Sequence, residues 1–240
     1  MNPDNAIGLY GKLPAYGDFL TRNLNATFIN PWDEWLQSFI SASQDQIGEN
    51  WLDIYLTSPI WRFVLSPGVI DKYMWCGLLM PSVDRVGRYF PITLVKPVDP
   101  AANPVNFMLN NQDWYNELES HTLTALDGRL DVDELMHAVN NSNSVLQEKY
   151  LPTINLGELG PSLIGLPSLD AKDTVEALPY IINALMSSSL TSFSLWQSSG
   201  SERISPLMFS CQGLPPIGGV GAMLDGEFQQ RDWKIPYNLQ

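Results

Sequence analysis

A compact group of charged residues, Asp84, Arg85 and Arg88, lies within the stretch Pro81–Arg88. Arginines without a nearby nucleophile or metal cluster suit recognition of a carboxylate, a phosphorylated residue or a peptide backbone better than bond cleavage. The alternative is an internal ion-pair network that holds this stretch in place. Both interpretations can hold together, because a loop fixed by one arginine can present the other.

Lys12 and Asp18 could extend this group from a second loop at residues 11–17. Two glycines and one proline predict a defined loop there. It is not a phosphate-binding loop, because the GxxxxGK[ST] spacing is absent. The two residues either line a recognition surface, or Asp18 caps a turn while Lys12 is solvated. Arg62 is a further candidate, either exposed at a rim or buried beside a carboxylate.

We predict no catalytic centre, no cofactor and no metal site. His121 and His137 lie in helical patterns without an HExxH motif. Cys76 and Cys211 lie in apolar stretches, where a reactive thiolate is disfavoured, and neither belongs to a CxxC pattern. No GxSxG elbow is present. Contact with a macromolecule is therefore the leading hypothesis.

Two other hypotheses stay open. The first is an enzyme or small-ligand module with its site between the loops Lys12–Asp18 and Asp84–Arg88, which a deep pocket with converging polar groups would indicate. The second is a scaffold that forms a homo-oligomer through the eight tryptophans of the chain. Contiguous exposed tryptophans would indicate that scaffold.

A central hairpin is predicted to carry the Asp84 loop at its tip. Its arms are the apolar runs 75–80 and 89–95, and the second is rich in β-branched and aromatic residues. Neither run alternates apolar with polar residues, so both faces of each strand should be covered. Residues 60–65 predict a further strand, in which Trp61 is structural and Arg62 points to the opposite face.

A helix is predicted to start at Asn30, with Asn30 as N-cap and Pro31 in the first turn. Trp32 and Trp35 begin an apolar stripe of 3.6-residue spacing, which is typical of a helix packed on a core. A second short helix follows Gly48. We assign Trp32 and Trp35 structural roles.

The remaining chain predicts a helical middle and a second hairpin. Helical patterns cover residues 106–126, 131–150 and 174–186, with Asp131 as an N-cap and Glu134 completing a capping box. Residues 190–196 and 206–210 read as the strands of a hairpin.

These elements predict an α/β fold of the α+β type, with a mostly antiparallel central sheet flanked by helices. Residues 1–100 form its N-terminal region. Residues 101–240 form a helical and hairpin region that packs with the first as one globular unit, and the hairpin can join the sheet. Short β-pairing runs separated by helices make this the natural architecture.

The charge balance excludes some partners. The formal net charge is −13, and residues 101–240 carry −10 of it. An acidic chain repels phosphate backbones and anionic lipid, so nucleic acid and membrane surfaces are poor candidates. No apolar run long enough for a membrane span and no secretory signal is present, so we expect a cytoplasmic protein.

Four motifs in this sequence resemble those of the TagF (ImpM) family, the type VI secretion-associated proteins of Gram-negative bacteria. The motifs stand at residues 8–19, 32–36, 59–68 and 77–91 and read GLYGKLPAYGDF, WDEWL, PIWRFVLSPG and GLLMPSVDRVGRYFP. The resemblance covers residues 7 to 97 and is weak over the middle third of the chain.

This resemblance implies a longin-like N-terminal fold and a regulatory role. It implies repression of secretion-system assembly after translation, through contact with a forkhead-associated-domain component. On this view Lys12, Asp18, Asp84, Arg85 and Arg88 form part of the contact face. The oligomeric state stays open.

Overall fold

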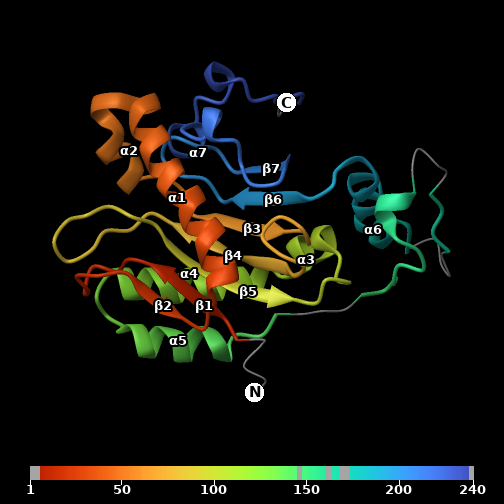
Figure 1. The fold of residues 1–240 in the computed structure, drawn as a ribbon, viewed down its shortest axis with the longest axis horizontal. Coiled ribbons are helices and arrows are strands. Elements are labelled where there is room, and N and C mark those ends of the chain that lie inside the picture. The colour runs from red at the N-terminus through yellow and green to blue at the C-terminus, as the bar shows by residue number, and fades with distance from the viewer. Residues whose placement is uncertain (1–5, 145–147, 160–163, 168–172, 238–240) are drawn as a thin grey trace.

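The structure is a computed structural model that describes residues 6–144, 148–159, 164–167 and 173–237. In these residues, seven strands form one antiparallel sheet with the order β2-β1-β5-β4-β3-β6-β7 (Figure 1). The strands are β1 Gly8–Gly11, β2 Leu20–Arg22, β3 Trp61–Leu65, β4 Met74–Met80, β5 Ile92–Val98, β6 Phe193–Ser198 and β7 Leu207–Gln212. The predicted fold class, a mostly antiparallel sheet flanked by helices, is confirmed.

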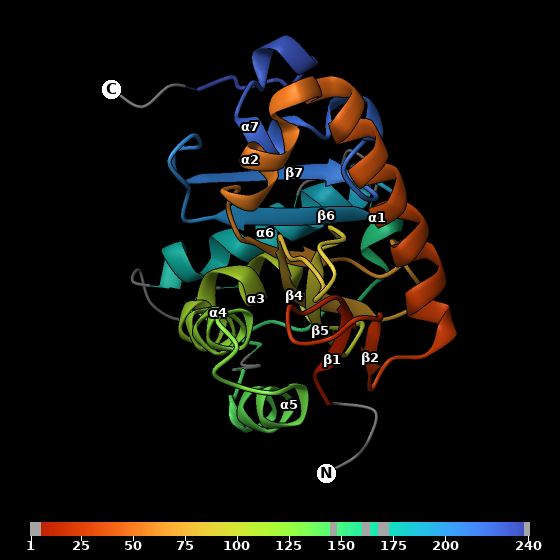
Figure 2. The ribbon, with the colours of Figure 1, turned by 90° about the vertical axis from the view of Figure 1, so that its left-hand side faces the viewer.

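Helices cover both faces of the sheet. Figure 2 shows α1 on one side and α4 and α5 on the other. The helices are α1 Ala26–Ile47, α2 Trp51–Leu56, α3 Pro104–Asn110, α4 Gln112–Leu126, α5 Val132–Asn141, α6 Asp173–Ser189 and α7 Ala222–Asp225. Short 3-10 turns lie at Gly48–Asn50, Leu156–Glu158, Ile217–Gly219 and Gln229–Arg231. Two separate hydrophobic cores therefore form, one on each face of the sheet.

The core under α1 is built from aromatic rings. Trp32 is fully buried, and its ring centroid lies 5.1 Å from that of Phe63 and 6.4 Å from that of Trp196. Its indole N–H donates to the Thr93 hydroxyl at 2.9 Å. One side chain of α1 thus contacts strands β3, β5 and β6, which fixes the helix on the sheet.

Other tryptophans connect the sheet and α1 to the C-terminal segment. The indole N–H of Trp35 donates to the Pro215 carbonyl, and that of Trp61 donates to the Met223 carbonyl, each at 3.0 Å. Seven of the tryptophans are buried and Trp233 is half-buried. Contiguous exposed tryptophans, the signal expected for an oligomeric scaffold, are therefore not found.

The central hairpin of β4 and β5 has the pairing that the sequence predicts, with Gly77 opposite Val95. Its second arm starts later and ends later than the predicted run 89–95, because Tyr89 makes only an isolated bridge to Val83 and belongs to the loop. Glycine is required at position 77, where a Cβ atom would lie 2.0 Å from the Leu94 carbonyl oxygen.

The predicted start of the first helix is wrong. Helix α1 begins at Ala26, and the Asn25 side chain caps it by accepting from the Phe28 N–H at 3.1 Å. Phe28 is fully buried, 4.4 Å from the Trp75 ring, so packing extends the helix past Pro31. Proline is tolerated inside α1 because the carbonyl that it leaves unpaired belongs to the exposed first turn.

The helical middle also differs from the prediction. The single pattern 106–126 is two helices, because the chain breaks at Asn111 between α3 and α4. The capping box of Asp131 and Glu134 is present, yet α5 ends at Asn141 rather than at 150. The Ser and Asn residues that follow favour turns over helix. Residues 145–147 of that predicted helix lie outside the described residues.

The C-terminal hairpin of β6 and β7 joins the sheet, as predicted, through pairing of β6 with β3. Strands from both sides of residue 100 thus share one sheet, while the proposed division at that residue stays a prediction. Strand β2 was not predicted, because its three residues carry no alternation. No helix of the described residues is long and apolar enough to cross a membrane.

Candidate functional site

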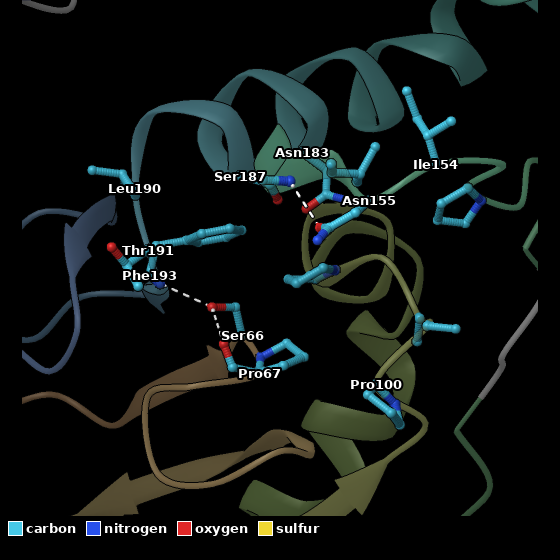
Figure 3. Close-up of a pocket in the computed structure, with 16 residues that line it drawn as sticks. Ser66, Pro67, Pro100, Ile154, Asn155, Asn183, Ser187, Leu190, Thr191 and Phe193 are labelled. Carbon is cyan, nitrogen blue, oxygen red and sulfur yellow. Dashed lines mark hydrogen bonds between the residues drawn. The ribbon is translucent and has the colours of Figure 1, made fainter. Parts of the chain in front are cut away.

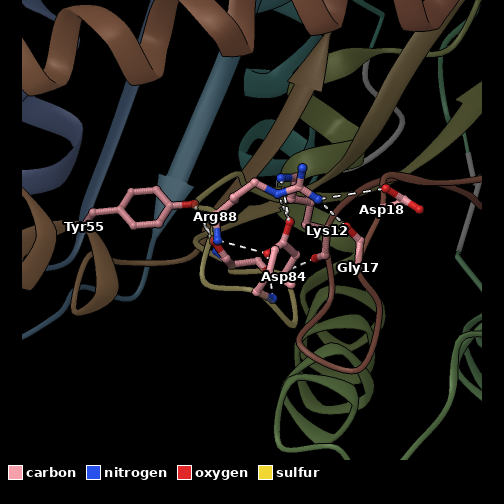
Figure 4. A network of polar contacts seen from close by, with 8 residues as sticks. Lys12, Gly17, Asp18, Tyr55, Asp84 and Arg88 are labelled. Carbon is pink, nitrogen blue, oxygen red and sulfur yellow. Dashed lines mark hydrogen bonds and ion pairs between the residues drawn. The ribbon is translucent and has the colours of Figure 1, made fainter.

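A buried carboxylate, Asp84, organises the loop between β4 and β5 (Figure 4). Its side chain accepts from Lys12 Nζ at 2.9 Å and from Arg88 Nε at 2.7 Å. Its other oxygen accepts from the backbone N–H groups of Val86 at 3.0 Å and Arg88 at 2.9 Å. Two cations and two amides therefore surround one carboxylate, which fixes the loop to the segment that follows β1.

The protonation state of Asp84 follows from these contacts. Burial raises the pKa of the carboxyl group, but the hydrogen bonds from Lys12, Arg88 and Val86 outweigh burial and hold the pKa well below its usual range. Asp84 is thus a carboxylate at neutral pH. It acts as an acceptor, and its bonds to both cations leave it poorly suited to proton transfer.

The backbone of the loop is held from the core side by Tyr55 of α2. The Tyr55 hydroxyl donates to the Ser82 carbonyl and accepts from the Ser82 N–H, both at 3.0 Å. The Ser82 hydroxyl in turn donates to the Lys12 carbonyl at 2.7 Å. At the tip, Gly87 adopts φ 87°, a left-handed conformation that glycine accepts at little cost. No motif or spacing in the sequence indicates that Tyr55 and Ser82 belong to the site.

Lys12 is buried, contrary to the interpretation in which it is solvated. It is 4% exposed, and its ammonium lies 4.8 Å from the centroid of the Phe19 ring. Phe19 is 48% exposed and packs edge-on against Phe90 at 4.8 Å. The cation therefore supports an aromatic ring that is half in solvent. Phe19 lies in the first family-like motif but was not predicted as a site residue.

The two arginines of the loop have different environments. The guanidinium of Arg88 contacts Asp84 and the Gly17 carbonyl and lies 3.9 Å from Asp18, although 58% of the side chain is exposed. Arg85 is exposed, and only its backbone N–H is bonded, to the Tyr16 carbonyl at 2.9 Å. Within the described residues, the Arg85 side chain makes no hydrogen bond or ion pair. One arginine thus fixes the loops and the other faces solvent.

Arg62 does not join this group. It is 4% exposed, and its guanidinium donates to Glu119 at 2.6 Å and to Gln112 and Asn116 at 2.7 Å each. All three acceptors lie on α4, on the sheet face opposite α1. Of the two alternatives for Arg62, the structure has the buried arginine paired with a carboxylate, in which it ties α4 to β3.

The chain shows no constellation for bond cleavage among the residues that are described. No group of three metal-ligating side chains is present there. Burial raises the pKa of the Cys76 thiol, so a thiolate is disfavoured. His137 is exposed and contacts Asn141 of its own helix. Lys12, Asp84 and Arg88 converge between the two loops, but Lys12 and Arg88 are both bonded to Asp84.

The cavity of Figure 3 lies beside α6 and not between the two loops. Its volume is about 350 Å³, and its lining carries no acidic or basic side chain. The polar groups in it are hydroxyls and amides, among them Ser66, Asn155 and Asn183. The Ser66 hydroxyl already accepts from the Phe193 N–H at 2.8 Å. This cavity therefore lacks the charged groups that acid–base catalysis requires.

Comparison with known families places these loops in context. Residues 8–142 match the family described as the TagF N-terminal domain, type VI secretion system-associated. The chain belongs to this family. Both loops of the Asp84 network lie inside the matched residues, so the network is part of the TagF N-terminal domain here.

A solved structure extends the likeness beyond the family match. The chain is similar to PA0076 from Pseudomonas aeruginosa PAO1, with 37% identity and a TM-score of 0.75. The similarity covers 98% of this chain and 99% of that chain. No protein with a curated description matches this chain.

Proposed function

We propose that this type VI secretion-associated protein represses assembly of the secretion apparatus after translation, by binding a forkhead-associated-domain component in the cytoplasm. It acts by contact and without catalysis. The observation that carries this proposal is that the cationic side chains around the Asp84 loop differ in whether they are bonded to Asp84. Arg88 and Lys12 are both bonded to Asp84, whereas Arg85 is exposed on a fixed backbone and its side chain makes no hydrogen bond or ion pair in the described residues.

The surface around Arg85 has the composition of a protein interface. Val86, next to it, is 67% exposed, and Phe19 on the facing loop is 48% exposed. Interfaces are enriched in arginine and aromatic side chains, and a loop whose backbone is already ordered loses little conformational entropy on binding. Because Asp84 and Tyr55 order the loop before any partner arrives, more of the contact energy is available as affinity.

Replacement of Arg85 by Ala tests the proposal. The matched control is Arg203→Ala, because Arg203 is also an exposed arginine in a hairpin connection and its side chain has no partner in the described residues. We expect Arg85→Ala to weaken binding of the purified forkhead-associated-domain component at least tenfold, measured by calorimetry. The control should bind as the parent chain does, and both variants should keep the parent melting temperature.

Equal affinities of the parent chain and Arg85→Ala would remove Arg85 from the contact. Restored secretion in cells that carry Arg85→Ala, with the control still repressed, is the expected cellular result. Turnover of any small molecule by the purified chain would contradict the contact mechanism. Asp84→Ala leaves buried Lys12 unpaired and should melt below the parent. Loss of the partner at a temperature where this variant is still folded would show that binding needs the ordered loop.

A further inference from the structure

Helix α6 exposes a continuous apolar stripe. Val175 is 72% exposed, Leu178 49%, Ile182 43% and Leu185 52%. These residues follow the spacing i, i+3, i+7 and i+10, so all four lie on one side of the helix. Scattered exposed aliphatic residues are common on proteins, but four in phase on one helix form a surface.

The opposite side of α6 is packed against the rest of the domain, so α6 has a fixed position in the fold. Ala177, Tyr180 and Ala184 are at most 8% exposed. The Asn103 amide donates to the Pro179 carbonyl at 3.3 Å, which ties α6 to the start of α3. Contacts to the domain therefore fix the rotation of α6 and leave the stripe outside.

The residue types in the stripe match one kind of partner. Read as a heptad, Val175 and Ile182 occupy the a positions, and Leu178 and Leu185 occupy the d positions. A β-branched residue at a with leucine at d favours a parallel, two-stranded pairing of helices. In such a pair each helix presents the same stripe, so the pattern complements a second copy of itself.

The charge around the stripe agrees with self-association. Its flanks are formed by Pro179 and Met186 on one side and Ile181 and Ser188 on the other, all uncharged. Beside Val175, at the N-terminal end of the stripe, lie Glu148 and Glu176, and Glu176 is paired with Lys149 at 2.8 Å. A chain of net charge −13 repels its own copy at most approaches, but not along this neutral strip.

We propose that α6 is a homodimerisation surface, in which two copies of α6 pair side by side, in parallel, about a two-fold axis. Such an axis brings each residue of the stripe opposite itself, as an isologous interface requires. The stripe spans less than two heptads, and an interface this small is typical of weak association. We expect a dissociation constant on the order of 10–100 μM. Figure 1 shows α6 at the end of the molecule away from the β1–β2 and β4–β5 loops, so both loops stay open in the dimer.

Sedimentation velocity of the whole chain from 5 to 500 μM tests this proposal. We expect the parent chain to shift from monomer to dimer across that range. Leu178→Ser together with Ile182→Ser should stay monomeric throughout, which corresponds to a loss of at least tenfold in affinity. The matched control is Leu123→Ser, because Leu123 is a leucine of α4 with 47% exposure. A parent chain that is monomeric at 500 μM overturns the proposal, as does a dimer that survives the double substitution.

A cross-link tests the parallel orientation. In a parallel pair, Val175→Cys places two thiols opposite each other near the N-terminal ends of the helices, and mild oxidation should give a disulfide dimer. Leu123→Cys should give none. Both variants also carry Cys211→Ser, because Cys211 is half-buried, whereas Cys76 is buried and does not interfere. A sedimenting dimer whose Val175→Cys form does not cross-link overturns the parallel arrangement.

Discussion

Tyr55→Phe removes one oxygen atom and should loosen the loop that carries Arg85. Tyr55 is 1% exposed, and burial raises the pKa of its phenol, so the hydroxyl stays protonated and both donates to and accepts from Ser82. The Ser82 N–H has no other partner in the described contacts, whereas its carbonyl also accepts from the Phe90 N–H at 3.1 Å. The substitution therefore leaves one buried donor unpaired.

The magnitude follows from these two bonds. An unpaired buried donor costs about 1–3 kcal/mol, and loss of the bond to the carbonyl costs about 1 kcal/mol more. We expect the free energy of unfolding to fall by about 2–4 kcal/mol. For a protein of this length, that corresponds to a melting temperature lower by about 4–16 °C.

Thermal unfolding and amide hydrogen exchange measure this effect. Exchange at the Ser82 N–H should become faster in Tyr55→Phe, together with exchange along the loop to Phe90. Tyr73→Phe is the matched control, because that tyrosine is 40% exposed and should change the melting temperature by about 1 °C or less. If the two variants melt together, the Tyr55 hydroxyl does not hold the loop and the reasoning fails.

Three further predictions concern the buried charges and the close strand pairing. Because the pKa of folded Asp84 is lowered, its carboxylate stabilises the chain above the ordinary pKa of about 4, and the stabilisation disappears as the pH falls through the folded-state pKa. The difference in free energy of unfolding between the parent and Asp84→Asn, measured by urea titration, should therefore become smaller below about pH 4. A difference that does not change with pH would contradict this. Arg62→Met should lower the free energy of unfolding by about 3 kcal/mol. This is the lower end of the range for a broken buried ion pair, because the Glu119 side chain is 18% exposed. Arg62→Met with Glu119→Met should be more stable than Arg62→Met alone, and equal urea midpoints would argue against the pair. Gly77→Ala should destabilise by more than about 3 kcal/mol, since its Cβ would meet strand backbone, while Gly218→Ala, with open space around it, should melt as the parent does.

The sheet was predictable where strand patterns are long and apolar. The runs at β3 and at the β4–β5 hairpin are buried on both faces, and their composition shows it. The start of α1 was not predictable from local rules, because Asn30 and Pro31 make a better cap signal than Asn25. The burial of Phe28 against Trp75, a contact between distant segments, decides the helix start.

The sequence predicts that the charged residues of the Asp84 loop lie together, but not which of them bond to one another; that they form a contact site stays a prediction. Asp84, Arg85 and Arg88 stand close together in the sequence, so their proximity needs no structure. Arg88, and not Arg85, is bonded to Gly17 and Asp18. This choice depends on the position of Gly17 and Asp18, which the turn after β1 determines. The burial of Lys12 under Phe19 likewise results from tertiary packing.

Strand β6 supplies the outer neighbour of β3, although 127 residues separate Leu65 from Phe193 in the sequence. During synthesis on the ribosome, the edge of β3 that pairs with β6 therefore has unpaired amide and carbonyl groups until the last fifth of the chain emerges. A fragment cut after residue 142, where the family match ends, would keep that open row and lose Trp196 from the aromatic core. Such a fragment should aggregate through strand pairing, so the family boundary is not a safe place to cut this protein.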